Sequence, residues 1–146
     1  CNLLVAHAEV YRALKAMPGG SEARIGIVHN YMLFEAKGKS VLYAGTKYLS
    51  GRLNHWWGNQ LVIDFFNTGT FKWEHPLWGH MEHREPQPPR TDWLGINYYT
   101  RSLHSPLFLP TCRKGEYMTD MPYRAYPTGL YDAVNHMSEL KVPIYI

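Results

Sequence analysis

The chain has 146 residues, of which 45% are hydrophobic and 18% are charged, a composition typical of one folded domain with an ordinary core. The formal net charge of +3 comes from Lys and Arg residues scattered along the chain. No basic run therefore indicates a nucleic-acid or membrane-surface partner, and we expect an uncharged one. The longest apolar stretch, residues 61–66, contains Asp64 and is too short for a membrane span, so we expect a soluble chain.

The aromatic content is high, with 5 Trp and 11 Tyr. Flat amphipathic rings line many sites for sugars and other ring-shaped ligands, and they are also ordinary core material. Composition alone leaves both interpretations open.

The two cysteines, Cys1 and Cys112, lie far apart and form neither a disulfide framework nor a metal-binding pair. This pattern favours a reducing compartment, and we expect a cytoplasmic location. The chain begins without an initiator Met or a signal peptide and stops on an apolar segment. We therefore expect both termini to be cuts through a larger fold.

The first half of the chain predicts a helix, a strand and a second helix. A stripe at three-and-four spacing predicts the first helix, and its members are Leu3, Ala6, Val10, Leu14 and Met17. Residues 18–20, Pro-Gly-Gly, end it. Residues 24–31 cluster Ile and Val as in a strand covered on both faces, and residues 46–66 return to helical spacing.

The second half predicts two further strands. Residues 72–90 are crowded with Pro, His and Glu and are predicted to be a loop, and residues 93–100 are predicted as a strand. A polar connection, residues 101–126, leads to a third helix that starts near Pro127 and Thr128, and residues 142–146 form the last strand. Alternating helices and strands predict right-handed crossovers and a parallel sheet, hence an α/β fold. Three strands cannot close a barrel, so we expect open sheet edges.

The run Trp-Leu-Gly-Ile-Asn-Tyr-Tyr-Thr at residues 93–100 resembles the sixth barrel strand of glycoside hydrolase family 1, which contains β-glucosidases and related β-glycosidases. Other segments resemble this family in its own order, at residues 2–8, 25–28, 118–121, 126–131 and 143–146. The resemblance covers essentially the whole chain. It implies one partial (β/α)8 TIM barrel over residues 1–146, from the helix after barrel strand 4 to strand 7. A complete barrel needs about 250 residues.

The resemblance also implies that both catalytic carboxylates lie outside this chain. In this family the acid/base Glu belongs to an Asn-Glu-Pro motif before the first helix, and the nucleophile belongs to a Thr-Glu-Asn-Gly motif after Ile146. Retaining glycosidases need both carboxyl groups, about 5 Å apart, so we expect no hydrolysis by this chain alone. We expect its own glutamates to be solvated, and the ones considered as substitutes are Glu9, Glu82, Glu85 and Glu139.

Three residues are candidates for the sugar pocket by the same resemblance. Asn30 corresponds to an asparagine at the end of barrel strand 5, where an amide can bind sugar hydroxyls. Tyr99 corresponds to a tyrosine that hydrogen-bonds the nucleophile, and Asn97 is its neighbour in the pocket. Two alternatives remain: Asn30 is a turn residue, and the strand residues fill the barrel interior without touching substrate. Glu35 matches a family Glu and is expected to be structural.

The chain departs from the family pattern at several positions. Pro122-Tyr123-Arg124 replaces the usual Gly-Trp-Glu, so Tyr123 becomes the candidate on the aglycone side and the leaving-group preference is in doubt. Ala36 stands where Pro is usual, and His29 and Tyr31 flank Asn30 in place of more typical residues.

The His-rich segment, residues 75–83, is not expected to bind a metal. The spacing of His75, His80 and His83 fits no familiar ligand pattern, and Pro76 and Gly79 argue against a shared helix face. We therefore expect no metal and no cofactor. His7 and His55 are expected on helix surfaces or in packing contacts.

Two functional hypotheses follow. In the first, the chain is part of a retaining β-glycosidase that binds a β-glycoside or another sugar, and the remainder of the barrel covers its open edges. In the second, it is a non-catalytic structural or binding subunit derived from such a barrel, and partner chains cover those edges.

Overall fold

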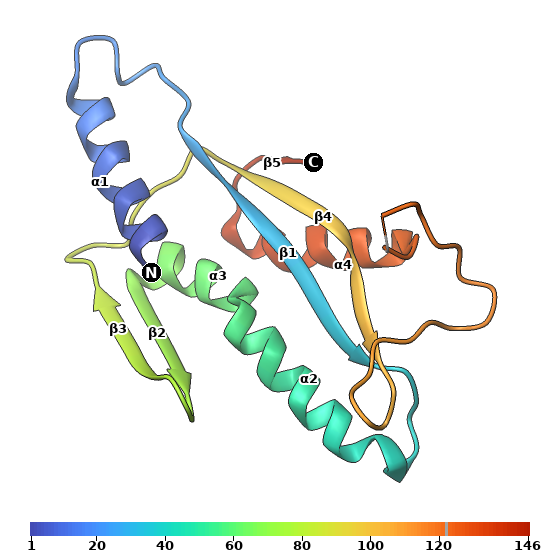
Figure 1. The fold of residues 1–146 in the computed structure, drawn as a ribbon. Coiled ribbons are helices and arrows are strands. Elements are labelled where there is room, and N and C mark those ends of the chain that lie inside the picture. Colours follow the sequence, from blue (N-terminus) through green and yellow to red (C-terminus); the bar gives the residue numbers. More distant parts are fainter. Residues whose placement is uncertain (122) are drawn as a thin grey trace.

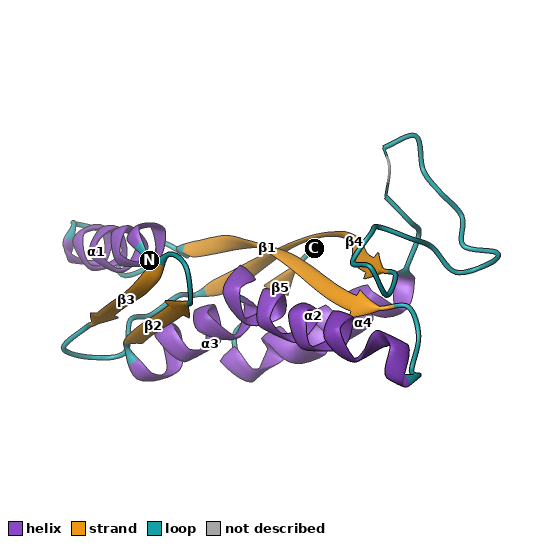
Figure 2. Cartoon of the chain, turned by 60° about the horizontal axis from the view of Figure 1, so that its bottom comes forward, coloured by secondary structure: helices purple, strands orange, loops and turns teal. Residues whose placement is uncertain are grey.

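The computed structural model describes residues 1–121 and 123–146. Its centre is a parallel sheet in the order β1-β4-β5, built from β1 (Gly26–Ala36), β4 (Trp93–His104) and β5 (Ile144–Tyr145). The predicted α/β class and strand order are therefore confirmed. Figure 2 shows α2, α3 and α4 on one face of this sheet, and no described helix lies on the other face.

The helices agree with the predicted pattern at most positions. The α-helices are α1 (Asn2–Ala16), α2 (Ala44–Trp57), α3 (Asn59–Thr68) and α4 (Pro127–Met137), and two short 3-10 turns are η1 (Val41–Tyr43) and η2 (Ser138–Leu140). No helix in the described parts of the chain has the length and apolar character needed to cross a membrane.

The single helix predicted over residues 46–66 is two helices. Gly58 has φ 94, a left-handed conformation that favours glycine, and its N–H donates to the His55 carbonyl to close α2. The next residue, Asn59, begins α3. The apolar spacing continues through the break, so periodicity alone did not reveal it.

The segment predicted as a loop contains an antiparallel hairpin of β2 (Thr70–His75) and β3 (Gly79–Arg84). In β2 the buried or half-buried residues Phe71, Trp73 and His75 alternate with exposed polar ones. The loop prediction rests on the Pro, His and Glu content of residues 72–90, which hides this period of two. Most of β3 is exposed, so its sequence carries no burial pattern.

The central strands are longer than predicted, and the last strand is shorter. A bulge lies between the pairs Tyr31↔Tyr98 and Leu33↔Arg101, where β4 has one residue more than β1. The strands continue beyond it to Ala36 and His104. A bulge changes which residues share a face, and the alternation expected from a regular strand stops there.

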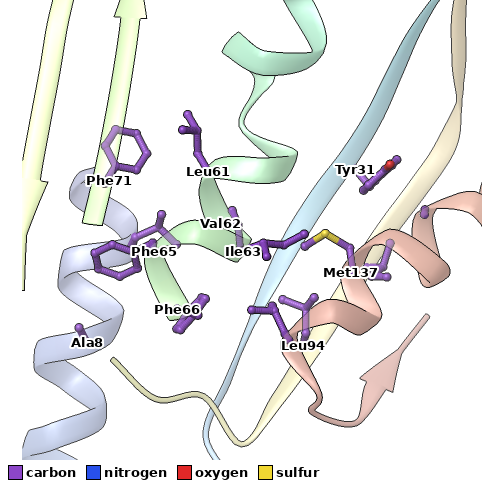
Figure 3. Close-up of a cluster of buried hydrophobic side chains, with 14 residues drawn as sticks. Ala8, Tyr31, Leu61, Val62, Ile63, Phe65, Phe66, Phe71, Leu94 and Met137 are labelled. Carbon is purple, nitrogen blue, oxygen red and sulfur yellow. The ribbon is translucent and has the colours of Figure 1, made fainter. Parts of the chain in front are cut away.

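The core lies between the sheet and the helices (Figure 3). Phe65 and Met137 are fully buried, and Leu94 of the sheet belongs to the same cluster of buried side chains. Ala8 of α1 and Phe71 of β2 belong to the same cluster, so the first helix and the hairpin pack on α3. Figure 1 shows α1 and the hairpin beside the β1 edge of the sheet.

Candidate functional site

Figure 2 shows that the helices leave one face of the sheet uncovered, and the alternation of side chains places the candidate pocket residues on that face. On the covered face, Tyr31 is buried and the Tyr98 hydroxyl donates to the Tyr126 carbonyl at the start of α4, at 3.0 Å. Side chains alternate along a strand, so the neighbours of these two tyrosines face the other way. These neighbours are Asn30, Asn97 and Tyr99, and all three are exposed.

Asn30 and Asn97 are partners in the parallel register of β1 and β4. The Asn97 amide nitrogen donates to the Tyr99 hydroxyl at 3.3 Å. The Asn30 side chain has no hydrogen-bond partner among the described residues, and the Asn30 backbone carbonyl accepts from the Trp57 indole. Both amides therefore keep donors and acceptors for a polar ligand.

Barrel active sites form at the carboxyl ends of strands, and the resemblance therefore predicts Asn30, Asn97 and Tyr99 at those ends. The structure corrects this expectation, because all three lie in the middle of their strands. Both strands continue past the bulge. Asn30 is consequently a strand residue and not a turn residue, and that alternative is wrong.

Tyr123 packs against Tyr99 at one side of the candidate pocket residues. Its ring lies 5.4 Å from the Tyr99 ring at an interplanar angle of 28°, a stacked arrangement. The segment that carries it is fixed to β4 because the Thr100 hydroxyl donates to the Arg124 carbonyl at 2.7 Å. The neighbouring Pro122, part of the sequence departure noted above, lies outside the described residues.

A buried arginine holds the same segment to the sheet. Arg101 is 1% exposed and forms ion pairs with Glu35, at 3.1 Å, and with Glu116. Its guanidinium lies over the Tyr126 ring, 3.5 Å from the centroid. Burial raises the pKa of Glu116, but hydrogen bonds from the Arg113 N–H and from Arg101 outweigh it and lower that pKa overall. Glu35 thus has a protein partner, in agreement with the structural role expected for it.

Apolar side chains cover the same face of the sheet near the start of the strands. A Cβ at Gly26 would meet the Trp93 ring at 2.1 Å, and one at Gly95 would meet Val28 at 2.8 Å. The two glycines therefore allow these larger side chains to lie flat on the sheet. Trp93 also meets Tyr145 of β5 edge to face, with centroids 5.5 Å apart. The exposed face is apolar at one end and polar around Asn97.

No carboxylate among the described residues forms a hydrogen bond or ion pair with Asn30, Asn97 or Tyr99. Glu9 pairs with Arg12 on the surface of α1. A chemical step that needs a carboxylate at this face would have to receive it from elsewhere.

The expectation that Glu85 is solvated is wrong. Glu85 is 6% exposed and accepts hydrogen bonds from His83, at 2.7 Å, and Arg12, at 2.9 Å. The His83 bond is the main cause of its lowered pKa. Glu82 is exposed as expected but lies in β3 and not in a loop.

The histidines contact aromatic and amide side chains in the structure. His75 stacks with Trp78 at 4.1 Å, and His29 shares a hydrogen bond with Asn59 at 2.9 Å. Burial is the main reason that the pKa of His29 is lowered. Within the described ranges, no group of three His, Cys, Asp or Glu residues is arranged to hold a metal ion.

Arg101 and Trp93 are site residues that the sequence reasoning missed. A charged residue directly after an apolar strand was the available signal for Arg101. Trp93 was placed in a strand, but its contact with Gly26 depends on the register between two distant segments.

Comparison with known proteins gives two related sequences, and no family model matches the chain. It is 26% identical to a β-galactosidase of Sulfolobus acidocaldarius over an alignment of 173 positions, which covers 99% of this chain and 30% of that protein. It is 30% identical to a β-galactosidase of Pyrococcus woesei over 78 positions, which cover 38% of this chain and 15% of that protein. The chain spans less than a third of either relative's length. These likenesses support a relationship to glycosidases.

Proposed function

We propose that the chain is a segment of a retaining β-glycosidase of glycoside hydrolase family 1 and that it supplies one wall of the sugar pocket. The observation that carries the proposal is the grouping of Asn30, Asn97 and Tyr99 on the uncovered face of a parallel sheet. The likeness to two β-galactosidases supports the same assignment.

In this proposal the two asparagine amides bind sugar hydroxyls, and the Tyr99 hydroxyl orients the nucleophilic carboxylate. Tyr123, stacked on Tyr99, flanks the leaving group. The pair Gly95↔Tyr145 sets the register of β5 against β4. Residues that continue β5 past Ile146 would therefore run alongside Asn97 and Tyr99, where a nucleophile would meet the tyrosine hydroxyl.

The reaction itself needs two carboxyl groups from the rest of a complete barrel. One attacks the anomeric carbon and forms the glycosyl-enzyme, while the other protonates the leaving oxygen and then takes a proton from water. The residues of this chain bind and orient, and they move no proton by themselves. No cofactor takes part in the proposed reaction.

The free edge of β1 supports the proposal that further chain covers this segment. Side chains of Trp57, Asn59 and Asn54 hydrogen-bond the backbone of residues 30, 32 and 34. No described side chain does so at residues 26 and 28. That half of the edge borders an apolar groove of about 430 Å³, lined by residues that include Leu3, Val28 and Trp57. We propose that the remainder of the barrel packs into this groove.

The test compares this chain with a longer protein that contains the flanking Asn-Glu-Pro and Thr-Glu-Asn-Gly motifs. The longer protein is expected to release an aryl leaving group from a β-glycoside, and this chain alone is expected not to. In the longer protein, Tyr99→Phe should lower kcat by about tenfold or more, since it removes one preorganised donor. Tyr48→Phe is the control, because Tyr48 is an exposed residue of α2.

Two outcomes would contradict the proposal. Turnover by this chain alone that falls in Tyr99→Phe would reveal a catalytic carboxylate within it. An inactive longer protein with both motifs intact would favour the non-catalytic subunit.

A further inference from the structure

Trp78, in the turn between β2 and β3, differs from the other tryptophans of the chain in the hydrogen bonding of its indole. Four of the five tryptophans donate their indole N–H to a backbone carbonyl, and they are Trp56, Trp57, Trp73 and Trp93. Trp78 is 76% exposed, and its indole N–H has no acceptor among the described residues. It therefore keeps both a ring and a donor for a ligand.

Buried His75 fixes the orientation of this ring. The Trp78 and His75 rings stack with centroids 4.1 Å apart and planes 19° apart. The His75 Nδ1 atom accepts the backbone N–H groups of Leu77, at 3.1 Å, and Trp78, at 3.2 Å. On its other sides His75 meets Trp56, at 4.1 Å, and Trp73, at 5.7 Å. The Trp78 ring is thus packed on one face and open to solvent on the other.

A polar hollow of about 400 Å³ adjoins the same turn. Its lining includes His75 together with Arg52, Glu74 and His80. Arg52 lies over the Trp56 ring, 5.0 Å from its centroid, and Glu74 pairs with Lys72 at 3.1 Å. Contacts with the protein therefore hold a guanidinium and a carboxylate beside the stacked rings.

This combination fits a sugar better than it fits an apolar ligand. A pyranose whose substituents are all equatorial has a flat C–H surface that can lie on an indole, while hydroxyls project from its edge. Those hydroxyls need donors and acceptors beside the ring. The Trp78 N–H is one such donor, and Arg52 and Glu74 line the adjoining hollow, which Trp78 itself does not line. Because the ring is already held, little conformational freedom is lost on binding.

We propose that the β2–β3 turn is a second carbohydrate site that binds a β-linked glucose chain through Trp78. The site lies on the hairpin, which Figure 1 shows beside α1 and the β1 edge, whereas Asn97 and Tyr99 of the pocket face lie on β4. Such a site would retain a polymeric ligand near the pocket. The choice of a β-linked chain rests on the proposed function, whereas the site itself rests on the hairpin geometry.

The experiment follows the indole N–H signals of the intact chain by ¹⁵N NMR while cellotetraose is added. The Trp78 signal, assigned by its loss in Trp78→Phe, should shift in a saturable manner. Trp78→Ala should weaken binding about tenfold, the loss expected for one aromatic contact. Arg52→Ala should weaken it less, and Leu77→Ala, a change at an exposed neighbour, should leave it unchanged.

The signals of Trp57 and Trp93 report on the pocket face, since they donate to the backbone at Asn30 and Arg24. A shift at Trp78 that survives in Asn97→Ala supports the second site whether or not the pocket binds sugar. A shift confined to Trp57 or Trp93 would overturn the second site and would still agree with sugar binding at the pocket face. Equal affinity in Trp78→Ala, or no shift at Trp78 at saturation, would also overturn it.

Discussion

Asn30 of β1 and Asn97 of β4 stand opposite each other in a parallel register, on the face of the sheet that the helices leave uncovered. Neighbouring strands lie about 4.8 Å apart, so the two amides can reach hydroxyls of the same sugar ring. The Asn97 amide also donates to Tyr99, which connects sugar binding to the residue that would orient the nucleophile.

Asn97→Ala should therefore impair a catalytically complete protein that contains this segment. It removes a hydrogen bond to the sugar and the donor to Tyr99, and the loss should be about 1 to 3 kcal/mol, or about 5- to 150-fold in kcat/KM. Steady-state hydrolysis of an aryl β-glycoside measures it. Asn135→Ala, at an exposed position of α4, should have no effect. Equal kcat/KM in both variants would show that Asn97 does not contribute to the pocket.

Gly58→Ala and Gly51→Ala should change stability in opposite directions. Gly58 has φ 94, where a Cβ is strained, so alanine should cost about 1 to 2 kcal/mol. Gly51 lies inside α2 and has open space around it, so alanine should stabilise by about 0.5 to 1 kcal/mol. Urea unfolding of both variants tests this pair. Stabilisation by Gly58→Ala would mean that the two helices can join into one.

The sequence predicted the central sheet because its signals are local. Clustered apolar residues mark the starts of β1 and β4, and alternating side chains place Asn97 and Tyr99 on one face. The order of helices and strands then specifies a parallel sheet. None of these steps depends on contacts between distant residues.

The features that the sequence reasoning missed depend on distant contacts. Glu85 is buried because Arg12, far away in the sequence, approaches it. The stacking of Tyr123 on Tyr99 depends on the path of a long connection that carries no periodic pattern. The hairpin is stabilised by Phe71 packing into the core formed by α3.

Arg101→Met should destabilise the fold strongly. It leaves two carboxylates, Glu35 and Glu116, without their buried partner, and breaking such a pair costs about 3 to 5 kcal/mol. Arg113→Met is the control, because Arg113 is half exposed and lies 3.9 Å from Glu35, so it should cost less than about 1 kcal/mol. Urea unfolding measures both.

Near-UV circular dichroism of the Arg101 variant should also change, since the segment that stacks Tyr123 on Tyr99 loses its anchor. A variant of unchanged stability and spectrum would show that Thr100 alone holds that segment.

Asp92 should make the stability of the fold sensitive to acid. Burial opposes its ionisation, but hydrogen bonds from the Ile25 N–H, Lys15 and Tyr11 outweigh burial and lower its pKa from 3.8 to about 2. Because the pKa is lowered on folding, Asp92 contributes stability that is fully present above about pH 4 and is lost as the pH falls through 2. The side chain is partly exposed, so we expect a contribution of about 1 to 2 kcal/mol at neutral pH.

Asp92→Asn keeps an acceptor for Ile25 but loses the charge that pairs with Lys15 at 2.9 Å. Its deficit in unfolding free energy relative to the original chain should be constant from pH 7 to about pH 4 and should then shrink toward pH 2. The original chain should still lose stability in acid, because the pKa values of Glu85 and Glu116 are also lowered. The measurement is urea unfolding at several pH values, with the exposed Asp120→Asn as control. A deficit that stays constant down to pH 2 would show that the Asp92 charge does not stabilise the folded state.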